Sequence, residues 1–222
     1  MLGSKMGKIA IVTGGTGALG SAVARKFADV GYDVHLTSLF DAQVKAWQGP
    51  GRAHAIDLAN LEAVRAFARD FADVHALALC AGGYAGAEIA RVTAADLEGM
   101  MNINFKTAAH CLAAFASNLV AGSAAVLVGS QAYEGAAGSA PYAASKAACV
   151  TLARSAALEW KPKGVRVNAV LPDVIDTPAN RRGMPDANFD GWSKPEEVAD
   201  VIVWLCSPDA KVVSGNAIKV GR

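Results

Sequence analysis

The feature that most limits the possible folds is the regular alternation of short β-branched runs with longer alanine-rich runs along the chain. The β-branched runs predict strands and the runs between them predict helices. Strands that alternate with helices form a mostly parallel sheet covered on both faces. We therefore predict an α/β fold, a single-domain Rossmann-type doubly wound parallel sheet of about seven strands with helices on both faces. The predicted strands are 8–13, 33–38, 52–56, 74–80, 124–128, 165–171 and 217–220, and the predicted helices are 18–30, 41–47, 60–71, 94–117, 141–160 and 195–205.

Nothing in the sequence marks a second domain. The 222 residues contain no internal repeat, low-complexity tract or linker-like run, and this length is enough for one sizeable core. We expect residues 7–222 to form the domain, with a cofactor half at about 7–130 and a catalytic and substrate half at about 131–222. Residues 1–6 lack the long apolar stretch of a signal peptide, and we expect them to be a tag remnant or a disordered start.

The composition argues against several kinds of partner. Hydrophobic residues make up 53% of the chain, charged residues 18%, and the formal net charge is +1. These values indicate a globular protein, and they give no field that would attract nucleic acid or an anionic membrane. The four cysteines and four histidines are scattered without metal-ligand spacing. We therefore expect no metal site, no membrane span, buried free thiols and a cytoplasmic setting.

A glycine-rich stretch lies between the first predicted strand and the first predicted helix, where the chain reads Thr13-Gly-Gly-Thr-Gly-Ala-Leu-Gly20. Glycine lets the backbone turn tightly and approach a pyrophosphate, and the N–H groups of a helix start favour phosphate charge. Such a stretch is often only a tight turn, but its place between strand and helix predicts a dinucleotide site. The candidate cofactor-binding residues here are Gly14, Thr16, Gly17, Ala18, Leu19 and Gly20.

The end of the second predicted strand bears on the choice between NAD and NADP. Enzymes that use NAD usually place a carboxylate there, whereas this chain has Ser38. A hydroxyl can hydrogen-bond a 2′-phosphate without repelling it, so NADP is slightly favoured and NAD stays open. Asp41, nearby, is expected to cap a helix. Asp57 and Leu58 follow the third strand, and Asp57 either accepts from the adenine amino group or caps its own loop.

Tyr142 and Lys146 stand four residues apart in the stretch Tyr-Ala-Ala-Ser-Lys. On a helix this spacing is one turn, so the phenol and the ammonium share a face. A free tyrosine has a pKa near 10. We expect the ammonium to lower that pKa and to make the phenol fit for proton transfer. An ordinary helical tyrosine and lysine are the alternative, because this spacing is common by chance.

Two more polar residues are candidates for catalysis. Ser130 ends the fifth predicted strand, where it either binds the substrate or is a turn serine. Asn104 lies inside the helix predicted over 94–117, where asparagine is unfavourable and tends to bond locally. A functional interpretation is a kink at Asn104 that frees a carbonyl for a proton-relay water.

Taken in order along nearly the whole chain, these motifs resemble the short-chain dehydrogenase/reductase family. The matching segments are the glycine loop, Ala81-Gly82, Asn104, Ser130, Tyr142, Lys146, 166–172 and 175–178. The resemblance implies that Tyr142 donates or accepts the proton and that Lys146 activates it. It implies substrate stabilisation by Ser130 and a relay role for Asn104, and further cofactor contacts from Ala81, Gly82, Gly83, Pro172, Ile175 and Thr177. Many members pair through the helices that hold Asn104 and Tyr142, so a homodimer or homotetramer is expected.

Departures from the family's usual pattern point to one branch. They are Ala18 for the middle glycine of the loop, Leu79-Cys80 for a pair of asparagines, and Asp173 for a glycine. The stretches 14–20, 81–86 and 176–192 look like the dihydropteridine reductase branch, which reduces a quinonoid dihydropterin with a nicotinamide. Ser38 and Ser130 depart from that branch, and Ser130 makes ordinary carbonyl reduction chemically possible.

The expected function is NAD(P)H-dependent hydride transfer to a small-molecule substrate, with dihydropteridine reductase-like chemistry as the first interpretation. A generic reductase of ketones or quinones is one alternative, and a catalytically silent NAD(P)-sensing regulator is the other. Tyr84, Phe189 and Trp192 either stack on a planar substrate or anchor loops. Arg181 either touches substrate or a cofactor phosphate or belongs to a solvated pair.

Overall fold

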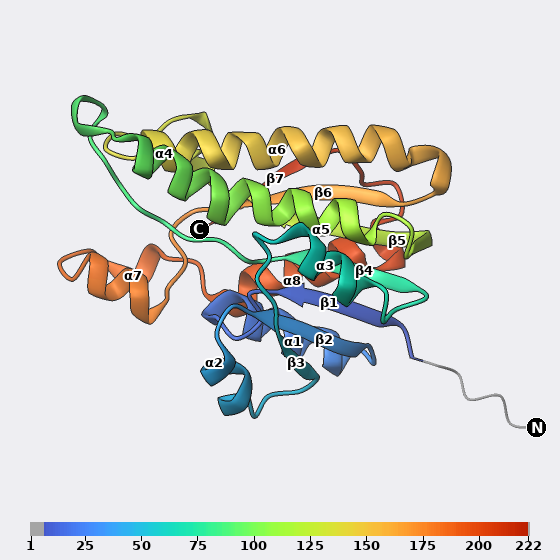
Figure 1. The fold of residues 1–222 in the computed structure, drawn as a ribbon. Helices are drawn as coiled ribbons and strands as arrows, with labels where there is room; N and C mark the ends of the chain where they lie inside the picture. Colours follow the sequence, from blue (N-terminus) through green and yellow to red (C-terminus); the bar gives the residue numbers. More distant parts are fainter. Residues whose placement is uncertain (1–6, 222) are drawn as a thin grey trace, which may run out of the picture.

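The computed structural model describes residues 7–221, so the expected tag remnant at residues 1–6 lies outside the described residues. In the described part, seven parallel strands form one sheet in the order β3-β2-β1-β4-β5-β6-β7 (Figure 1). The chain starts near the middle, moves outward to β3, crosses back to β4 and moves outward to β7, and the predicted fold class is confirmed. The strands are β1 (Ile9–Thr13), β2 (Asp33–Ser38), β3 (Arg52–Ala55), β4 (Val74–Leu79), β5 (Leu119–Val128), β6 (Arg166–Pro172) and β7 (Ala217–Val220).

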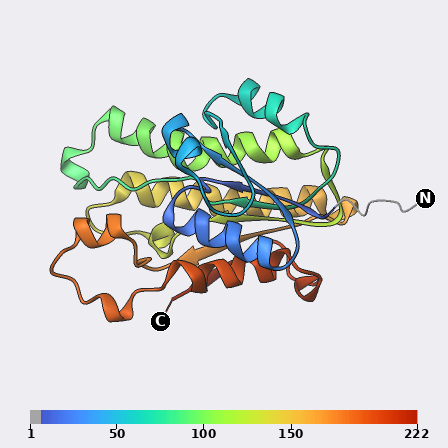
Figure 2. The ribbon, with the colours of Figure 1, turned by 90° about the horizontal axis from the view of Figure 1, so that it is seen from below.

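Helices cover both faces of the sheet. One face carries α3 (Leu61–Ala68), α5 (Thr107–Phe115) and α6 (Ala140–Trp160), and the other carries α1 (Ala18–Asp29) and α8 (Pro195–Cys206). Figure 2 shows α1 and α8 side by side across the second face. Three shorter helices are α2 (Asp41–Ala46), α4 (Ala94–Met100) and α7 (Pro178–Gly183). Of these, α4 and α7 project past the carboxyl ends of the strands, at the left of Figure 1.

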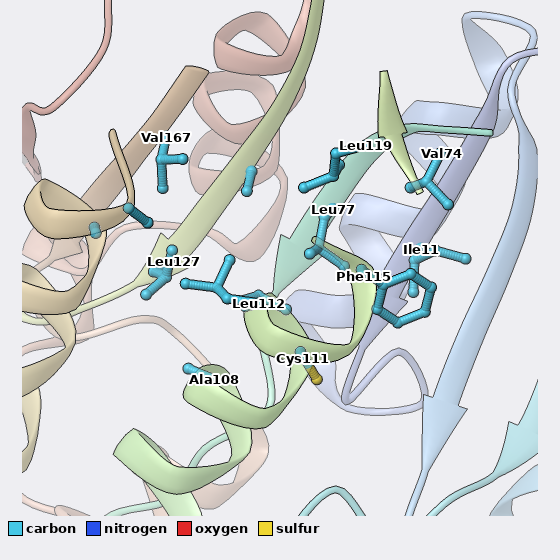
Figure 3. Close-up of a cluster of buried hydrophobic side chains, with 14 of the residues drawn as sticks. Ile11, Val74, Leu77, Ala108, Cys111, Leu112, Phe115, Leu119, Leu127 and Val167 are labelled. Atoms are coloured by element: carbon cyan, nitrogen blue, oxygen red, sulfur yellow. The ribbon is translucent and has the colours of Figure 1, made fainter. Parts of the chain in front are cut away.

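Each strand divides its side chains between two hydrophobic clusters, because successive side chains point to opposite faces. Ile11 of β1 joins Leu77 and Phe115 in the cluster beneath α3, α5 and α6 (Figure 3). Its neighbours Ala10 and Val12 face α1 and α8 instead. Burial on both faces accounts for the apolar strand sequences. A fully buried leucine such as Leu77 contributes about 1.5–3 kcal/mol.

The fifth strand begins earlier than the sequence predicts, at Leu119. Ser123 and the glycine before it favour a turn, but the structure keeps both inside the strand, where the pairing with β4 shifts between Val74 and Ala76. Ser123 Oγ donates to the Val74 carbonyl at 2.7 Å and accepts from Val120 N–H at 3.1 Å. The side chain therefore replaces ladder hydrogen bonds at the irregularity.

The long helix predicted over 94–117 is divided into three parts. The π-helical segment Met101–Lys106 separates α4 from α5. A capping box begins α4, in which Thr93 Oγ1 accepts from Asp96 N–H and the Asp96 carboxylate accepts from Thr93 N–H. A π-helical turn has one more residue than an α-helical one, and such turns are frequent at functional sites.

Other helix starts follow the sequence prediction only in part. The helix predicted over 60–71 begins at Leu61, and Asn60 caps it by accepting from two N–H groups at 3.1 and 3.2 Å. The prediction for Asp41 is wrong, because Asp41 is the first residue of α2 and Phe40 holds the cap position without a side-chain bond. The sequence pattern does not predict α7, whose Pro178 lies in a loop rich in proline, although proline suits the first turn of a helix.

Within residues 7–221, no helix combines the length and the apolar character that a membrane crossing requires. The same residues contain no group of three or more His, Cys, Asp or Glu side chains placed to hold a metal ion. All four cysteines are free thiols.

Candidate active site

The loops after β1, β4, β5 and β6 meet at the carboxyl edge of the sheet, as the alternating pattern predicts. Thr13 Oγ1, at the end of β1, accepts from Ala81 N–H at 3.0 Å. A Cβ on Gly14 would lie 2.9 Å from Ala81 Cα, so only glycine allows this close approach. A Cβ on Gly82 would lie 2.6 Å from Asn104 Oδ1 and 3.3 Å from Lys146 Nζ. The glycine loop, the β4 loop and the catalytic candidates are therefore in direct contact.

The glycine loop has the geometry of a phosphate cradle. Gly14 has a φ of 61°, which favours glycine, and Gly17 N–H donates to the Gly14 carbonyl at 3.0 Å. A Cβ on Gly20 would lie 2.2 Å from the same carbonyl oxygen. The first helical bond of α1 runs from Ser21 N–H to Gly17 O, and no side chain caps the helix. The N–H groups of Ala18, Leu19 and Gly20 can therefore hold an anionic group.

A polar cluster lies at the end of β2, and it includes Gln43, a residue that no sequence pattern indicates. Ser38 Oγ and Thr16 Oγ1 both donate to Gln43 Oε1, at 2.6 and 2.8 Å. Ser38 is buried, whereas Gln43 is exposed on α2. Gln43 belongs to no motif, because its contact depends on how α2 sits against the glycine loop. The cluster consists of two hydroxyls and an amide, and all three are neutral hydrogen-bonding groups.

In the loop after β3, Asp57 caps its own loop, which is the second of the two interpretations given for it. Asp57 Oδ1 accepts from Ala59 N–H at 2.9 Å and so closes its own turn. The Leu58 side chain is 7% exposed and belongs to the hydrophobic cluster beneath α3 and α5, and its carbonyl contacts His110 Nδ1 at 3.0 Å. Of these two residues, Asp57 offers the polar atoms that a bound adenine would meet.

Tyr142 and Lys146 lie on neighbouring turns of α6, with Lys146 Nζ 5.7 Å from the centre of the Tyr142 ring. Lys146 is 5% exposed, and its ammonium donates to the Val128 carbonyl at 2.9 Å. Burial lowers the pKa of Lys146. Burial also raises the pKa of Tyr142, and a hydrogen bond with the Ser130 side chain acts in the opposite direction. The predicted lowering of the Tyr142 pKa by Lys146 is therefore wrong for this structure, where desolvation dominates.

Ser130 lies beside the Tyr142 phenol. It follows β5 and holds the cap position of the short 3₁₀ turn Gln131–Glu134, where its Oγ accepts from Ala132 N–H at 3.2 Å. The same hydroxyl lies close enough to Tyr142 to act on the pKa of the phenol, which it lowers. The serine is thus both a turn residue and a neighbour of the phenol, so the two interpretations are compatible.

Asn104 ties the β4 loop to α6 from within the π-helical segment. Its Oδ1 accepts from Gly83 N–H at 3.0 Å, and its Nδ2 donates to the Gly83 carbonyl at 3.0 Å and to Ser145 Oγ at 3.1 Å. Its main-chain carbonyl accepts from Thr107 Oγ1 at 3.3 Å and from Cys149 Sγ at 3.5 Å. The helix does change geometry at Asn104, and the Asn104 carbonyl itself is engaged by these two side chains. Ser145 completes this network, and no sequence pattern indicates its contact with Asn104.

The loop after β6 is held by its own side chains. Asp173, where the family usually has glycine, accepts from Ser193 Oγ at 2.8 Å. This bond ties the end of β6, at Pro172, to the segment before α8. The Ile175 carbonyl accepts from Asn180 Nδ2 at 2.8 Å, and Thr177 Oγ1 caps α7. The main chain beyond Pro172 is therefore fixed beside the crevice.

The residues proposed to stack on substrate differ in their surroundings. Arg181 pairs with both carboxylate oxygens of Asp176, at 2.5 and 2.7 Å, and lies 4.6 Å from the centre of the Phe189 ring. Phe189 packs on Trp192 at 4.7 Å, and Trp192 is 9% exposed. These three side chains form a loop anchor. The geometry favours the anchor interpretation for Phe189 and Trp192, and Arg181 is neutralised within its own loop.

Tyr84 lies against the Tyr142 phenol. Its ring meets Tyr142 edge to face at 5.0 Å, and its hydroxyl is 2.9 Å from Ser139 Oγ. A Cβ on Gly86 would lie 2.8 Å from the Tyr84 hydroxyl, so glycine leaves room for that phenol. Tyr84 is 64% exposed, which makes it the aromatic side chain best placed to meet a ligand above Tyr142. Ser139 belongs to no recognisable motif, so the sequence does not indicate its contact with Tyr84.

Comparisons with known proteins agree with this geometry. The family model described as enoyl-(acyl carrier protein) reductase matches residues 15–221. The cyclic-di-GMP-binding biofilm dispersal mediator protein of Escherichia coli (strain K12) is 30% identical over 226 residues, covering 96% of this chain and 95% of that protein.

Two solved structures superpose over nearly the whole chain. The crystal structure of BdcA in complex with NADPH has a TM-score of 0.87 and 30% identity, and the match covers 96% of this chain and 92% of that one. The NADPH-bound short chain oxidoreductase from Pseudomonas aeruginosa PAO1, described as containing an atypical catalytic center, has a TM-score of 0.89, 26% identity, and coverage of 96% and 95%. The chain therefore belongs to the short-chain dehydrogenase/reductase family.

Proposed function

We propose that this chain is an NADP-dependent reductase in which Tyr142 gives a proton to a substrate that accepts hydride from the bound nicotinamide. The observation that carries the proposal is the cluster at the carboxyl edge of β5, where the Ser130 hydroxyl acts to lower the pKa of the Tyr142 phenol and Lys146 is buried on the next turn. A phenol, a hydroxyl and a fixed cation together can polarise and protonate a carbonyl oxygen or an imine nitrogen.

The roles of the three side chains follow from their contacts. A free phenol has a pKa near 10 and is protonated at neutral pH. Burial raises the pKa of Tyr142 further, and a protonated phenol suits a proton donor in a reduction. Ser130 can bind the same substrate atom from the other side. The Lys146 ammonium, held by the Val128 carbonyl, would hydrogen-bond the nicotinamide ribose and balance charge that develops on the phenol. Fixing the reactants in one crevice contributes through orientation.

The preference for NADP over NAD rests on the cluster of Ser38, Thr16 and Gln43. These neutral side chains can hydrogen-bond a 2′-phosphate. Two similar structures were solved with NADPH, which supports the same cofactor here. Asp57, Ala81, Gly82, Gly83, Pro172, Ile175 and Thr177 complete the proposed cofactor-binding set, with the main chain of Ile175 and the Thr177 side chain at the carboxamide.

For the substrate we retain quinonoid dihydropterin as the first candidate, on the resemblance of stretches 14–20, 81–86 and 176–192 to dihydropteridine reductase. Ketones and quinones are the alternative, because Ser130 lies where a carbonyl oxygen would need it. Tyr84 beside Tyr142 suits a flat substrate of either kind. Oxidation of NADPH and NADH should be followed at 340 nm with quinonoid dihydropterin, simple ketones and quinones. Turnover of none of these by the NADPH-loaded protein would contradict the proposal.

A regulator that holds NADP without turnover is a second candidate. It is favoured by the 30% identical relative, whose name describes a cyclic-di-GMP-binding mediator of biofilm dispersal. Tight NADPH binding with no oxidation by any substrate, together with binding of cyclic di-GMP, would favour this function. The cluster of Ser130, Tyr142 and Lys146 argues for the enzyme.

We also propose that the chain forms a homodimer or homotetramer in a reducing compartment such as the cytoplasm. Ile103 of the π-helical segment and Leu97 of α4 are exposed, at 42% and 48%, on the side of the sheet that α5 and α6 cover. Exposed apolar side chains on helices suit an interface between copies. Light scattering would measure the mass in solution.

A further inference from the structure

A large groove lies at the opposite edge of the sheet from the active site. Its volume is about 980 Å³, which is in the range of pockets that hold nucleotide-sized ligands. It runs beneath the amino ends of β1 and β6, between the last turn of α6 and the segment that follows α8. We call it the basal groove. In Figure 1 this edge is at the right, where α6 ends.

The charged side chains that line the basal groove all have one sign. They are Lys8, Arg154, Lys161, Arg166 and Lys211, with no Asp or Glu among the lining residues. The whole chain has 21 basic and 20 acidic residues, so the composition does not account for this bias. Asp209 lines a smaller cavity next to the groove, of about 410 Å³, and not the groove itself.

The exposed cations of the groove have no ionic partner. Among the described residues, Lys8, Arg154, Lys161 and Lys211 form no ion pair. A set of unpaired like charges within one concave surface raises the local concentration of anions.

The floor of the groove holds a buried cation. Arg166 is 9% exposed, and its guanidinium donates to the Leu205 carbonyl at 2.6 Å and the Ser207 carbonyl at 3.0 Å. No carboxylate among the described residues pairs with it. Buried charges are usually paired. Because no carboxylate offsets the charge of Arg166, that charge adds to the positive potential of the groove.

A simpler account is that the cations complement the negative ends of helix dipoles. It fits Lys161, which directly follows α6, and Lys211, which lies five residues after the end of α8. It also fits Arg166, which donates to the Leu205 carbonyl in the last turn of α8. It does not fit Lys8, which precedes β1, or Arg154, which lies more than one turn before the end of α6. The cations therefore exceed what the helix ends require.

The groove also offers apolar surface. Tyr32 is half-buried, and Leu158 and Val212, which are 76% and 87% exposed, line it with the cations. A small inorganic anion would leave this surface in water. We propose that the basal groove binds an organic phosphate with an aromatic base, of the purine nucleotide class, at a site separate from the cofactor site. The inference goes beyond the proposed function and does not depend on turnover.

The test is a fluorescence titration with mant-ATP, a nucleotide that carries a fluorescent methylanthraniloyl group. The protein first receives one equivalent of NADP⁺, which is not fluorescent and fills the cofactor site without an excess that would compete in the groove. Wild-type protein should bind mant-ATP. The double variant Arg154→Glu/Lys161→Glu should bind it at least tenfold more weakly. Arg69→Glu, a charge reversal at the exposed residue that directly follows α3 and lies outside the groove, should bind as wild type does.

Two controls make the result specific. NADPH should bind all of these proteins equally in a separate titration, which shows that the variants are folded. Unlabelled ATP and AMP should displace mant-ATP, and inorganic phosphate at the same concentration should not, because it lacks the aromatic base.

Three outcomes would overturn the proposal. They are no binding of mant-ATP to wild type up to millimolar concentration, equal binding by the double variant, and displacement by inorganic phosphate as effective as by ATP. A fall in mass for Leu158→Glu by light scattering, with no mant-ATP binding to wild type, would show that a second copy of the chain covers the groove instead. None of these results involves NADPH oxidation, so they are independent of the proposed reductase activity.

Discussion

Replacing Gln43 with glutamate is expected to reduce the preference for NADPH over NADH. Gln43 Oε1 accepts from Ser38 Oγ at 2.6 Å and from Thr16 Oγ1 at 2.8 Å. Glutamate keeps an oxygen for both donors but adds a negative charge beside the proposed 2′-phosphate site. Two unit charges about 5 Å apart repel by about 1–3 kcal/mol across the range from bulk water to a protein surface. Because Gln43 is exposed, we expect the lower part of that range, about 1–2 kcal/mol, or about 5–30-fold in Kd.

The assay is a fluorescence titration of NADPH and NADH on wild type, Gln43→Glu and Gln43→Ala. The Kd for NADPH should rise about 5–30-fold in Gln43→Glu, and more at low than at high salt, because surface charges are screened. The Kd for NADH should stay within about twofold, since NADH lacks the 2′-phosphate. Gln43→Ala controls for loss of the two hydrogen bonds without a new charge. Equal weakening of both nucleotides, or no salt dependence, would refute the reasoning, and so would a tenfold NADH preference in wild type.

Three more predictions concern catalysis, the glycine loop and pH. Tyr142→Phe should bind NADPH as wild type does and lose about 10²–10⁴ in turnover, measured at 340 nm; unchanged turnover would overturn the mechanism. Gly20→Ala should weaken NADPH binding at least tenfold, because the new Cβ would lie 2.2 Å from a loop carbonyl oxygen, whereas Gly17→Ala, at 3.3 Å, should have a smaller effect in the same titration. His35 and His54 contact each other at 3.0 Å, and burial lowers the pKa of both. The unfolded chain therefore binds more protons, and stability should fall as pH drops from the ordinary histidine pKa of about 6.5 through the folded values. A Tm that is constant from pH 7.5 to 5 would contradict this.

Most of the sheet could be predicted because its strands are short apolar runs between helices and turns. The bounds of β2 and β7 agree with the sequence prediction. β5 was predicted too short because a side chain, Ser123, bonds to Val74 in a strand that lies 49 residues earlier. Periodicity records which face a residue occupies, and it holds no information on such distant partners.

The candidate site was predictable where a residue type is required by local backbone, as at Gly14 with its positive φ. It was not predictable where the requirement is tertiary. Gln43 reaches Ser38 only because α2 folds back over the glycine loop. The pKa of Tyr142 is governed by burial, and the degree of burial depends on every element that packs around the crevice. Spacing alone placed Lys146 beside Tyr142 but gave no measure of how strongly each is desolvated.

Asn104 shows how a local conflict in the sequence locates a site that motifs define only loosely. Asparagine is a poor residue for a helix interior, yet here it is 1% exposed in a π-helical turn. The oxygen and the NH₂ group of its side-chain amide are both hydrogen-bonded, to Gly83 in the β4 loop and to Ser145 of α6. Removing the side chain would leave buried donors and acceptors unpaired, which costs about 1–3 kcal/mol for each group. The unfavourable helix residue is thus stabilised only by contacts that hold the β4 loop against α6, and for that reason it lies where the cofactor and the catalytic phenol are proposed to meet.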